Sequence, residues 1–277
     1  MRYKGEVARD EYDRTPGERW SKLRHMRRSP LHYKHAIAQP DVTTDAFKIG
    51  GACHCALLEP EHFAARYTVY SESKTTGKGA RTSWQEFQRA NAHRIILSQD
   101  EWDRALAIAA AVRAHPAAAE LLARGRAEVP LTWTDARTGI RCKARLDWGT
   151  AKHQLVEVKS TANLDAHAFA NIAWKYSYFH QVHYYARGLA AQLGRNPEQI
   201  ETFVIAVESA PPHDVVVYCP EDSALEAAQE EVEQILTQLA LCLERDHWPG
   251  RAEQQQILNA PRYVVDSEED DWTVTGG

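Results

Sequence analysis

Apolar residues follow two different periods along this chain, and the change from one to the other lies near residue 128. Before that point the apolar positions have helical spacing, and they predict helices at 31–38, 44–58 and 98–113. Ser29 is the predicted N-cap of the first helix, with Pro30 at its first position. Ser98 and Glu101 form a predicted capping box at the start of the third. Residues 70–82 contain few apolar side chains and predict a flexible loop.

Beyond residue 128, short β-branched or alternating runs replace the helical spacing. They predict strands at 129–134, 140–148, 153–159, 203–207 and 215–218. A helix rich in aromatic residues is predicted at 165–193 and a long helix at 221–244. This order predicts an α/β or α+β core, in which a central mixed β-sheet is flanked by helices and preceded by a helical N-terminal portion, and it argues against a Rossmann sheet.

The same pattern predicts one domain at 1–265 followed by a tail. The domain is expected to have a helical part at about 1–127, a sheet core at about 128–220 and a closing helix at about 221–246. Residues 266–277 are rich in acidic side chains and predict a flexible, solvated end.

The composition is that of an ordinary globular protein. The 277 residues are 44% hydrophobic and 26% charged, and 33 Lys and Arg against 38 Asp and Glu give a net charge of −5. This excludes a generically basic nucleic-acid coat but allows a local basic groove. No apolar run is long enough for a membrane span, and the N-terminus lacks the apolar region of a signal peptide. Five scattered cysteines without a CxxC pair argue against disulfides and favour a reducing, cytoplasmic location.

The strands predicted at 140–148 and 153–159 carry the candidate chemistry. Alternation, with Asp147 opposite Leu155, places one set of charged side chains on one face. This set consists of Arg141, Lys143, Arg145, Asp147, Glu157 and Lys159. Glu157 is then diagonal to Asp147 at roughly 7–8 Å, where two carboxylates attract a hard divalent cation such as Mg²⁺, and Lys159 could steady a nucleophile. A hairpin with a merely solvated charged face is an equal alternative from alternation alone.

Asp147, nine intervening residues and Glu157-Val158-Lys159 resemble the D…ExK signature of the PD-(D/E)xK nuclease superfamily. Further segments resemble the exonuclease VIII (RecE) C-terminal domain family: SPLHY at 29–33, IGGACHCALLEPE at 49–61, TGIRCKARLD at 138–147 and LVEVKST at 155–161. In the last segment Glu157 stands where the family has Asp, and Ser160 where it has Thr. The resemblance spans about residues 25–220.

The resemblance implies a restriction-endonuclease-like core and metal-dependent hydrolysis of DNA phosphodiesters. Mg²⁺ is the implied cofactor, for which Mn²⁺ substitutes, and its implied ligands are Asp147, Glu157, the Val158 carbonyl and His54. The residues implied to be catalytic are Asp147, Glu157, Lys159, Gln181, Tyr185 and His54. Gln181 and Tyr185 match a Q-x-x-x-Y motif and share one helix face. From the residues alone, His54 also fits a packed core histidine and Tyr185 the aromatic stripe of a buried helix.

Candidate partners follow from charge and from the resemblance. The predicted contacts to the DNA backbone are Arg141, Lys143 and Arg145 on the hairpin and Lys74, Lys78 and Arg81 on the loop. The family implies a 5′→3′ exonuclease that acts on ends of linear duplex DNA and leaves 3′ single strands for recombination and repair. It also implies a ring-shaped homotetramer and allows a single-strand annealing protein as partner.

Two alternatives stay open at this point. One is another nuclease of the superfamily, of the RecB-like or CRISPR-adaptation type. The latter typically holds an iron–sulfur cluster on four cysteines, which the scattered cysteines here do not match. The other is a catalytically silent DNA-binding module of the same fold, which has no need to bring two carboxylates near a phosphate.

Overall fold

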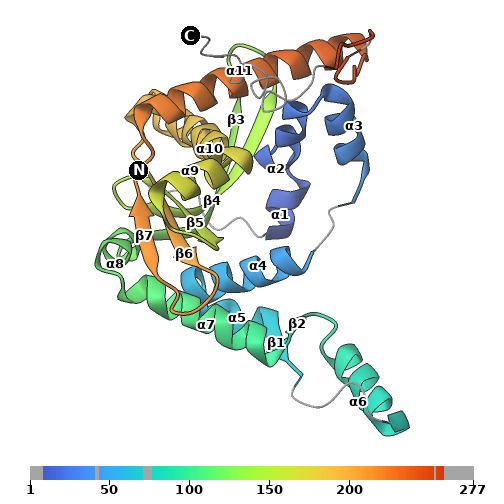
Figure 1. Ribbon diagram of the computed structural model, residues 1–277, viewed down its shortest axis with the longest axis vertical. Helices are drawn as coiled ribbons and strands as arrows, with labels where there is room; N and C mark the ends of the chain where they lie inside the picture. The colour runs from blue at the N-terminus through green and yellow to red at the C-terminus, as the bar shows by residue number, and fades with distance from the viewer. Residues whose placement is uncertain (1–8, 41–43, 71–76, 253, 259–277) are drawn as a thin grey trace, which may run out of the picture.

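A five-stranded mixed β-sheet lies at the centre of the computed structural model, which describes residues 9–40, 44–70, 77–252 and 254–258 (Figure 1). Its strands, in spatial order, are β3 (Gly125–Thr134), β4 (Arg141–Thr150), β5 (Leu155–Thr161), β6 (Thr202–Glu208) and β7 (Val215–Tyr218). β5 and β6 are parallel, and the other neighbouring pairs are antiparallel. The predicted mixed α/β architecture is therefore confirmed.

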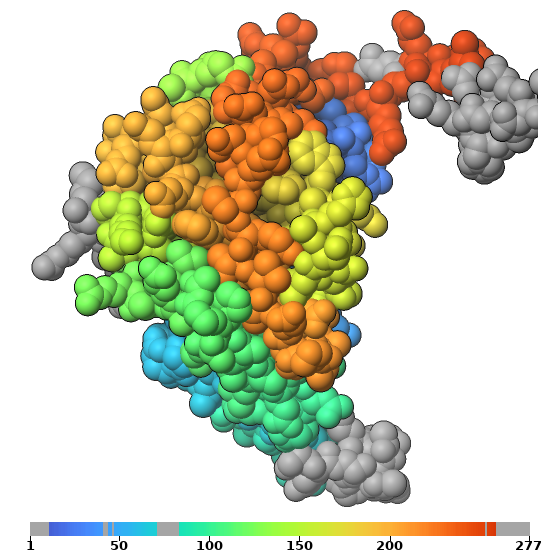
Figure 2. Space-filling model, turned by 60° about the vertical axis from the view of Figure 1, so that its left-hand side comes forward, coloured from blue at the N-terminus to red at the C-terminus, as the bar shows by residue number. Residues whose placement is uncertain are grey.

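Helices cover both faces of this sheet. One face packs against α4 (Asp45–Leu58), α7 (Gln99–Ala114) and α8 (Pro116–Leu122), and its core includes Val156, Val158 and Ile205. The other face packs against α9 (Ala166–Lys175) and α10 (Tyr178–Leu193), which form the crossover between the parallel strands. Figure 2 shows α7, in green, directly beside the orange segment that contains β6 and β7.

A third hydrophobic core lies between the N-terminal helices and two later helices of the chain. The helices α2 (Trp20–Leu23), η1 (Arg24–Arg27) and α3 (Pro30–Ala38) pack with α10 and α11 (Asp222–Arg245) around Leu23, Tyr184 and Leu236. The segment before them, with α1 (Arg9–Arg14), runs along β4, where the backbone of Glu18 is hydrogen-bonded to Arg141 and Lys143. The segment at 12–18 thus lies beside the strand that carries Asp147.

The helix starts predicted from capping residues are confirmed. The Ser29 hydroxyl accepts a hydrogen bond from the His32 amide at the start of α3. The Ser98 hydroxyl accepts one from the Glu101 amide at 3.2 Å, and the Glu101 carboxylate accepts one from the Ser98 amide at 2.8 Å. Both pairs satisfy amides that have no partner inside the helix.

Two predicted elements differ from the structure. The helix predicted at 165–193 is broken into α9 and α10 at Ser177, whose φ of 66° is left-handed. The predicted loop at 70–82 is wrong in its second half, because α6 (Gly77–Ala90) begins there and projects away from the body of the molecule (Figure 1). Trp84 and Phe87, beyond the predicted loop, pack on Tyr70 with ring centroids 4.9 Å apart in each pair and so hold this helix.

The remaining elements are short. They are α5 (Pro60–Arg66), the parallel strands β1 (Tyr67–Val69) and β2 (Ile95–Leu97), and η2 (Pro197–Gln199). In the described part of the chain no single helix is both long and apolar enough to span a membrane, and only α7 and α8 together reach that length, across a 93° bend. The predicted acidic tail at 266–277 lies outside the described residues.

Candidate active site

Strands β4 and β5 pair where Trp148 faces Val156 and Gly149 faces Leu155, and beyond these positions two carboxylates lie between the strands. The Val158 amide donates a hydrogen bond to Asp147 Oδ2 at 2.8 Å, and the Asp147 amide donates to Glu157 Oε1 at 3.4 Å. The acids thereby satisfy backbone amides that a regular ladder would satisfy with carbonyls. Asp147 and Glu157 are consequently held close together by the sheet itself.

The predicted register of this hairpin is wrong by two residues, since Leu155 pairs with Gly149 and not with Asp147. Asp147 and Glu157 therefore lie opposite each other instead of diagonally.

The predicted single polar face is also wrong, because the strands change face at the site. Ala127 and Trp148 pack into the core beside α4 and α7, whereas Val129 and Leu146, two positions along each strand, pack into the core beside α10. Regular alternation would place residues two apart on the same face. Glu128, with a left-handed φ of 52°, lies at this reversal, directly beside Asp147 across the β3–β4 pair.

His54 approaches Asp147 from helix α4. Its Nδ1 lies 3.4 Å from Asp147 Oδ1, and its Nε2 lies 3.1 Å from the carbonyl oxygen of Val158. The two glycines before it, Gly50 and Gly51, line the same cavity. The structure thus places the predicted His54, Asp147 and Val158 carbonyl together.

Lys159 and Gln181 converge on the buried Glu157. Lys159 Nζ lies 2.8 Å from Glu157 Oε2 and 3.9 Å from Asp147 Oδ2, and Gln181 Nε2 donates to Glu157 Oε2 at 2.8 Å. Tyr185, one helical turn after Gln181 on α10, lines the cavity that contains Asp147 and His54. All six residues predicted to be catalytic are therefore gathered around one point, although they come from α4, β4, β5 and α10.

Glu128 belongs to the same cluster and was not predicted. One ligand atom from each of His54, Glu128 and Asp147 lies within 4.8 Å of the others. Arg145 Nε lies 2.5 Å from Glu128 Oε2, and the Arg145 guanidinium lies over the Tyr12 ring at 5.3 Å. Glu128 precedes the strand predicted at 129–134, and only its cross-strand position beside Asp147 could have identified it.

The charged groups shift one another's pKa values strongly. Burial opposes ionisation of Asp147, but His54, Lys159 and the Val158 amide lower its pKa below the usual range. Burial and the Asp147 charge raise the pKa of Glu157 to about 7. Burial disfavours charged Lys159 and His54, yet the neighbouring carboxylates raise the pKa of both. Carboxylates held this close repel each other, and a bound cation would relieve that repulsion.

The donor set fits a divalent cation. Carboxylate and carbonyl oxygens are the preferred ligands of Mg²⁺ and Mn²⁺, and an imidazole nitrogen is compatible with Mn²⁺. Asp147, Glu128 and His54 supply such atoms around one point next to an open cavity, and the Val158 carbonyl lies 3.1 Å from His54 Nε2. Glu157, also predicted as a ligand, is not part of this group of three, and its Oε2 accepts from Lys159 and Gln181.

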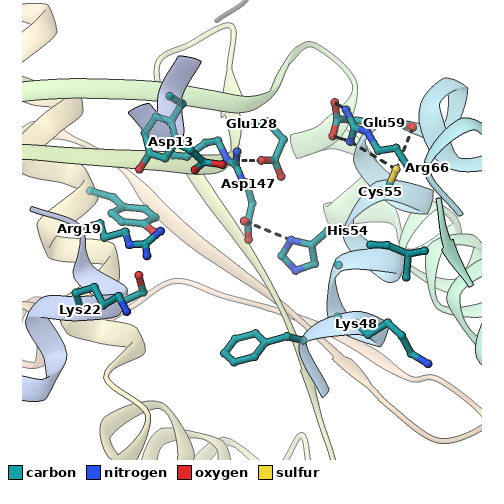
Figure 3. Close-up of a pocket in the computed structure, with 18 of the residues that line it drawn as sticks. Asp13, Arg19, Lys22, Lys48, His54, Cys55, Glu59, Arg66, Glu128 and Asp147 are labelled. Carbon is teal, nitrogen blue, oxygen red and sulfur yellow. Dashed lines mark hydrogen bonds and ion pairs between the residues drawn. The ribbon is translucent and has the colours of Figure 1, made fainter. Parts of the chain in front are cut away.

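This cavity has a volume of about 740 Å³, and its walls carry opposite charges. Asp147, Glu128 and His54 line it, and so do Arg19 and Arg24 from the N-terminal segment. Lys22 also lines it, but its ammonium group donates to the Ala36 carbonyl at 2.8 Å. Figure 3 shows Arg19 and Lys22 on one side of the cavity, His54 on the other, and Asp147 between them. These basic residues were not predicted, because their nearness to Asp147 depends on how the N-terminus folds back along β4.

The basic residues predicted to bind DNA have different surroundings. Lys143 does not fit this role, because its buried ammonium group donates to the carbonyls of Tyr12, Asp13 and Thr15 at 3.1, 3.2 and 2.8 Å. Arg145 lines the cavity but is paired with Glu128, and the exposed Arg141 lies outside the cavity. Lys78 and Arg81 belong to α6 and not to a loop, and Lys74 lies outside the described residues.

Comparisons with known proteins agree with this arrangement. A family model described as "PDDEXK-like domain of unknown function (DUF3799)" matches residues 20–261. No protein with a curated description matches the chain. Among solved structures, the chain is similar to a protein from Eubacterium rectale described as "Putative exonuclease". The identity is 12% and the TM-score 0.61, over 96% of this chain and 99% of that one. At this identity, the likeness shows a shared fold.

Proposed function

The chain belongs to the family of PDDEXK-like domains DUF3799, and on this premise we propose that it is a metal-dependent nuclease that degrades DNA from the ends of linear duplexes. One observation carries the proposal. Asp147, Glu157 and Lys159, with His54 from a distant helix, meet beside a cavity whose other wall is basic. A module that only binds DNA gains nothing from carboxylates next to a phosphate, since they repel it.

Each residue has a distinct task in this proposal. Asp147, His54, Glu128 and the Val158 carbonyl hold the cation, with Mg²⁺ as the expected ion and Mn²⁺ as its substitute. A bound ion would lower the pKa of a coordinated water molecule and would neutralise negative charge on the phosphate.

The groups around Glu157 position the nucleophile. Glu157 is fixed by Gln181 and Lys159, which both donate to its Oε2. The Lys159 ammonium keeps its proton, because both carboxylates raise its pKa, and it can therefore donate to the attacking oxygen or to the phosphate. Tyr185 stays protonated, since burial raises the pKa of its hydroxyl, and it is available as a further donor in the cavity.

The basic wall gives the phosphate backbone a place to bind. Arg19 and Arg24 line the same cavity as Asp147 and His54, and Figure 3 shows Arg19 across the cavity from His54. A phosphate bound in the cavity would therefore meet guanidinium groups as well as the cation. A local wall of this kind is compatible with the net charge of −5.

The finer features of the activity rest on the resemblance to the exonuclease VIII family. We propose 5′→3′ polarity, 3′ single-stranded products used in recombination and repair, assembly as a ring-shaped homotetramer, and a single-strand annealing protein as partner. The five cysteines are free thiols, which supports a reducing compartment such as the cytoplasm.

The test is degradation of end-labelled linear and circular duplex DNA, with Mg²⁺ or with EDTA. We expect the wild-type protein to degrade the linear duplex only when Mg²⁺ is present. Glu157→Gln and Lys159→Met should each lower this rate by about 10³-fold, since several kcal/mol of transition-state stabilisation is lost. Glu244→Gln, at an exposed position on α11, is the matched control and should keep full activity. The proposal would be contradicted if Glu157→Gln and Lys159→Met degraded DNA as fast as the wild type. It would also be contradicted if the wild-type protein degraded DNA in EDTA.

A further inference from the structure

Two large apolar side chains are exposed in the cavity, alongside its charged residues. Phe47, in the first turn of α4, is 63% exposed, and Ile95, at the start of β2, is 42% exposed. Both line the cavity that contains Asp147. Exposing a phenylalanine to water is unfavourable, and near a binding site such a side chain indicates a contact with a ligand.

Phe47 shares one face of α4 with the metal-binding histidine. Phe47, Gly50, Gly51 and His54 are spaced by three, four and seven positions and all line the cavity. Seven residues of α-helix rise about 10 Å, which equals about three base steps of 3.4 Å along a nucleic acid strand. The ring is therefore within a few nucleotides of a phosphate held at Asp147.

The helix surface between these two side chains is bare backbone. A Cβ atom at Gly50 would meet nothing within 4 Å, and one at Gly51 would lie 3.1 Å from the Tyr67 hydroxyl. Glycine at position 50 lets a ligand approach the helix closely on its way from Phe47 to His54, whereas Gly51 makes room for the Tyr67 hydroxyl.

Charge complementarity identifies the occupant. An apolar peptide on Phe47 would cover the charged side chains of the cavity, among them Arg24, and would offer them no anionic group in place of water, which is costly. A nucleic acid strand has both properties that the cavity requires: anionic phosphates for the basic wall and the cation, and flat apolar base faces for the phenylalanine.

We propose that Phe47 stacks on a base of the DNA strand being cut and so holds the end of the duplex at the metal site. This inference rests on the proposed nuclease function and adds a substrate feature to it, an end whose base is free to stack. Binding through Phe47 is independent of charge, in contrast to binding through the basic wall.

The experiment compares steady-state kinetics of linear duplex degradation for Phe47→Ala, Phe47→Leu and Phe47→Trp. Loss of a stacked base costs about 1–3 kcal/mol, so Phe47→Ala should raise KM by about 5- to 150-fold while kcat changes little. Phe47→Trp should keep the wild-type KM, whereas Phe47→Leu, which is apolar but not flat, should resemble the alanine variant. The dependence of KM on salt concentration should stay the same in all three, because no charge is removed.

The controls separate the possible failures. Leu106→Ala removes a similarly exposed apolar side chain, on α7 outside the cavity, and should change nothing. A KM unchanged by Phe47→Ala, or restored by leucine as well as by tryptophan, would overturn the stacking role while leaving the nuclease function intact. A changed sedimentation coefficient with unchanged KM would assign Phe47 to a contact between copies of the chain. A wild-type protein that degrades no DNA would instead contradict the proposed function itself.

Discussion

Two clusters in this protein each combine carboxylate, arginine and histidine side chains, but they differ in charge balance. The first is the cluster around Asp147, where Glu128, Asp147 and Glu157 face Arg145, Lys159 and His54. The second joins η1, α10 and α11, where Glu231 accepts from Arg27 Nε at 2.9 Å and lies 3.0 Å from His180 Nε2.

The second cluster is saturated in charge, although His180 Nδ1 is buried without a hydrogen-bond partner in the described structure. Arg27 also donates to the Ser177 hydroxyl at 2.8 Å and to the Trp174 carbonyl at 3.2 Å, so its guanidinium has partners on several sides. Burial, followed by the Arg27 charge, lowers the pKa of His180, which therefore stays neutral at pH 7. One carboxylate thus faces one cation, and the cluster needs no further ion.

The cluster around Asp147 is short of positive charge and open to a cavity. Three carboxylates share two permanent cations, and burial raises the pKa values of Glu157 and Glu128. The comparison teaches that a histidine beside a carboxylate does not identify a metal site. The cluster around Asp147 has a further feature, uncompensated negative charge next to open space, where a cation could enter and relieve the repulsion.

The largest effect that would sharpen this comparison is expected at Glu128. Glu128→Gln removes the negative charge of one of the three clustered groups and should weaken the apparent affinity for Mg²⁺ or Mn²⁺ by about 10- to 100-fold, a loss of the size found for altered metal environments. The measurement is nuclease rate against metal concentration, and excess metal should restore most of the rate.

The control for this experiment is Glu120→Gln, at an exposed position on α8. A metal dependence that matches the wild type, combined with a lower melting temperature, would contradict the prediction. Glu128 would then only hold Arg145 in place.

A smaller effect is expected in the saturated cluster. Glu231→Ala leaves Arg27 and His180 without their acceptor and should lower the free energy of unfolding by about 1–2 kcal/mol, since the carboxylate is partly exposed and solvent replaces part of the interaction. Urea denaturation measures this change, and the nuclease rate below the unfolding transition should equal that of the wild type. Full stability with lost activity would instead make this cluster a second functional site.

Sequence patterns predicted the parts of this fold and site that depend on neighbours along the chain. The caps at Ser29 and Ser98, the strand periodicity and the ten-residue separation of Asp147 and Glu157 are local properties, and the structure contains them. His54 and Gln181 are distant in sequence but belong to motifs of recognisable spacing. Their gathering around Asp147 could be expected from the resemblance.

The features that were not predicted all depend on three-dimensional packing. The register of β4 and β5 is set by carboxylates that replace ladder bonds, and the change of face is set by the left-handed Glu128. Neither follows from strict alternation. Likewise, Arg19 enters the site only because the N-terminal segment runs along β4, and that same segment buries the ammonium group of Lys143.

Single basic residues also differ in whether backbone or carboxylate groups already accept their hydrogen bonds. The smallest effect is expected for this difference. Arg24→Ala removes a charge from the cavity wall and should reduce the slope of log affinity for DNA against log salt concentration by about one. Between 50 and 200 mM salt, one unit of slope corresponds to about a fourfold difference in affinity.

Lys143→Met should leave the slope unchanged, because the ammonium group already donates to three backbone carbonyls. It should lower stability instead, since those carbonyls lose a donor. Fluorescence anisotropy of labelled duplex across a salt series measures the slopes, and equal reductions in both variants would show that Lys143 reaches the DNA after all.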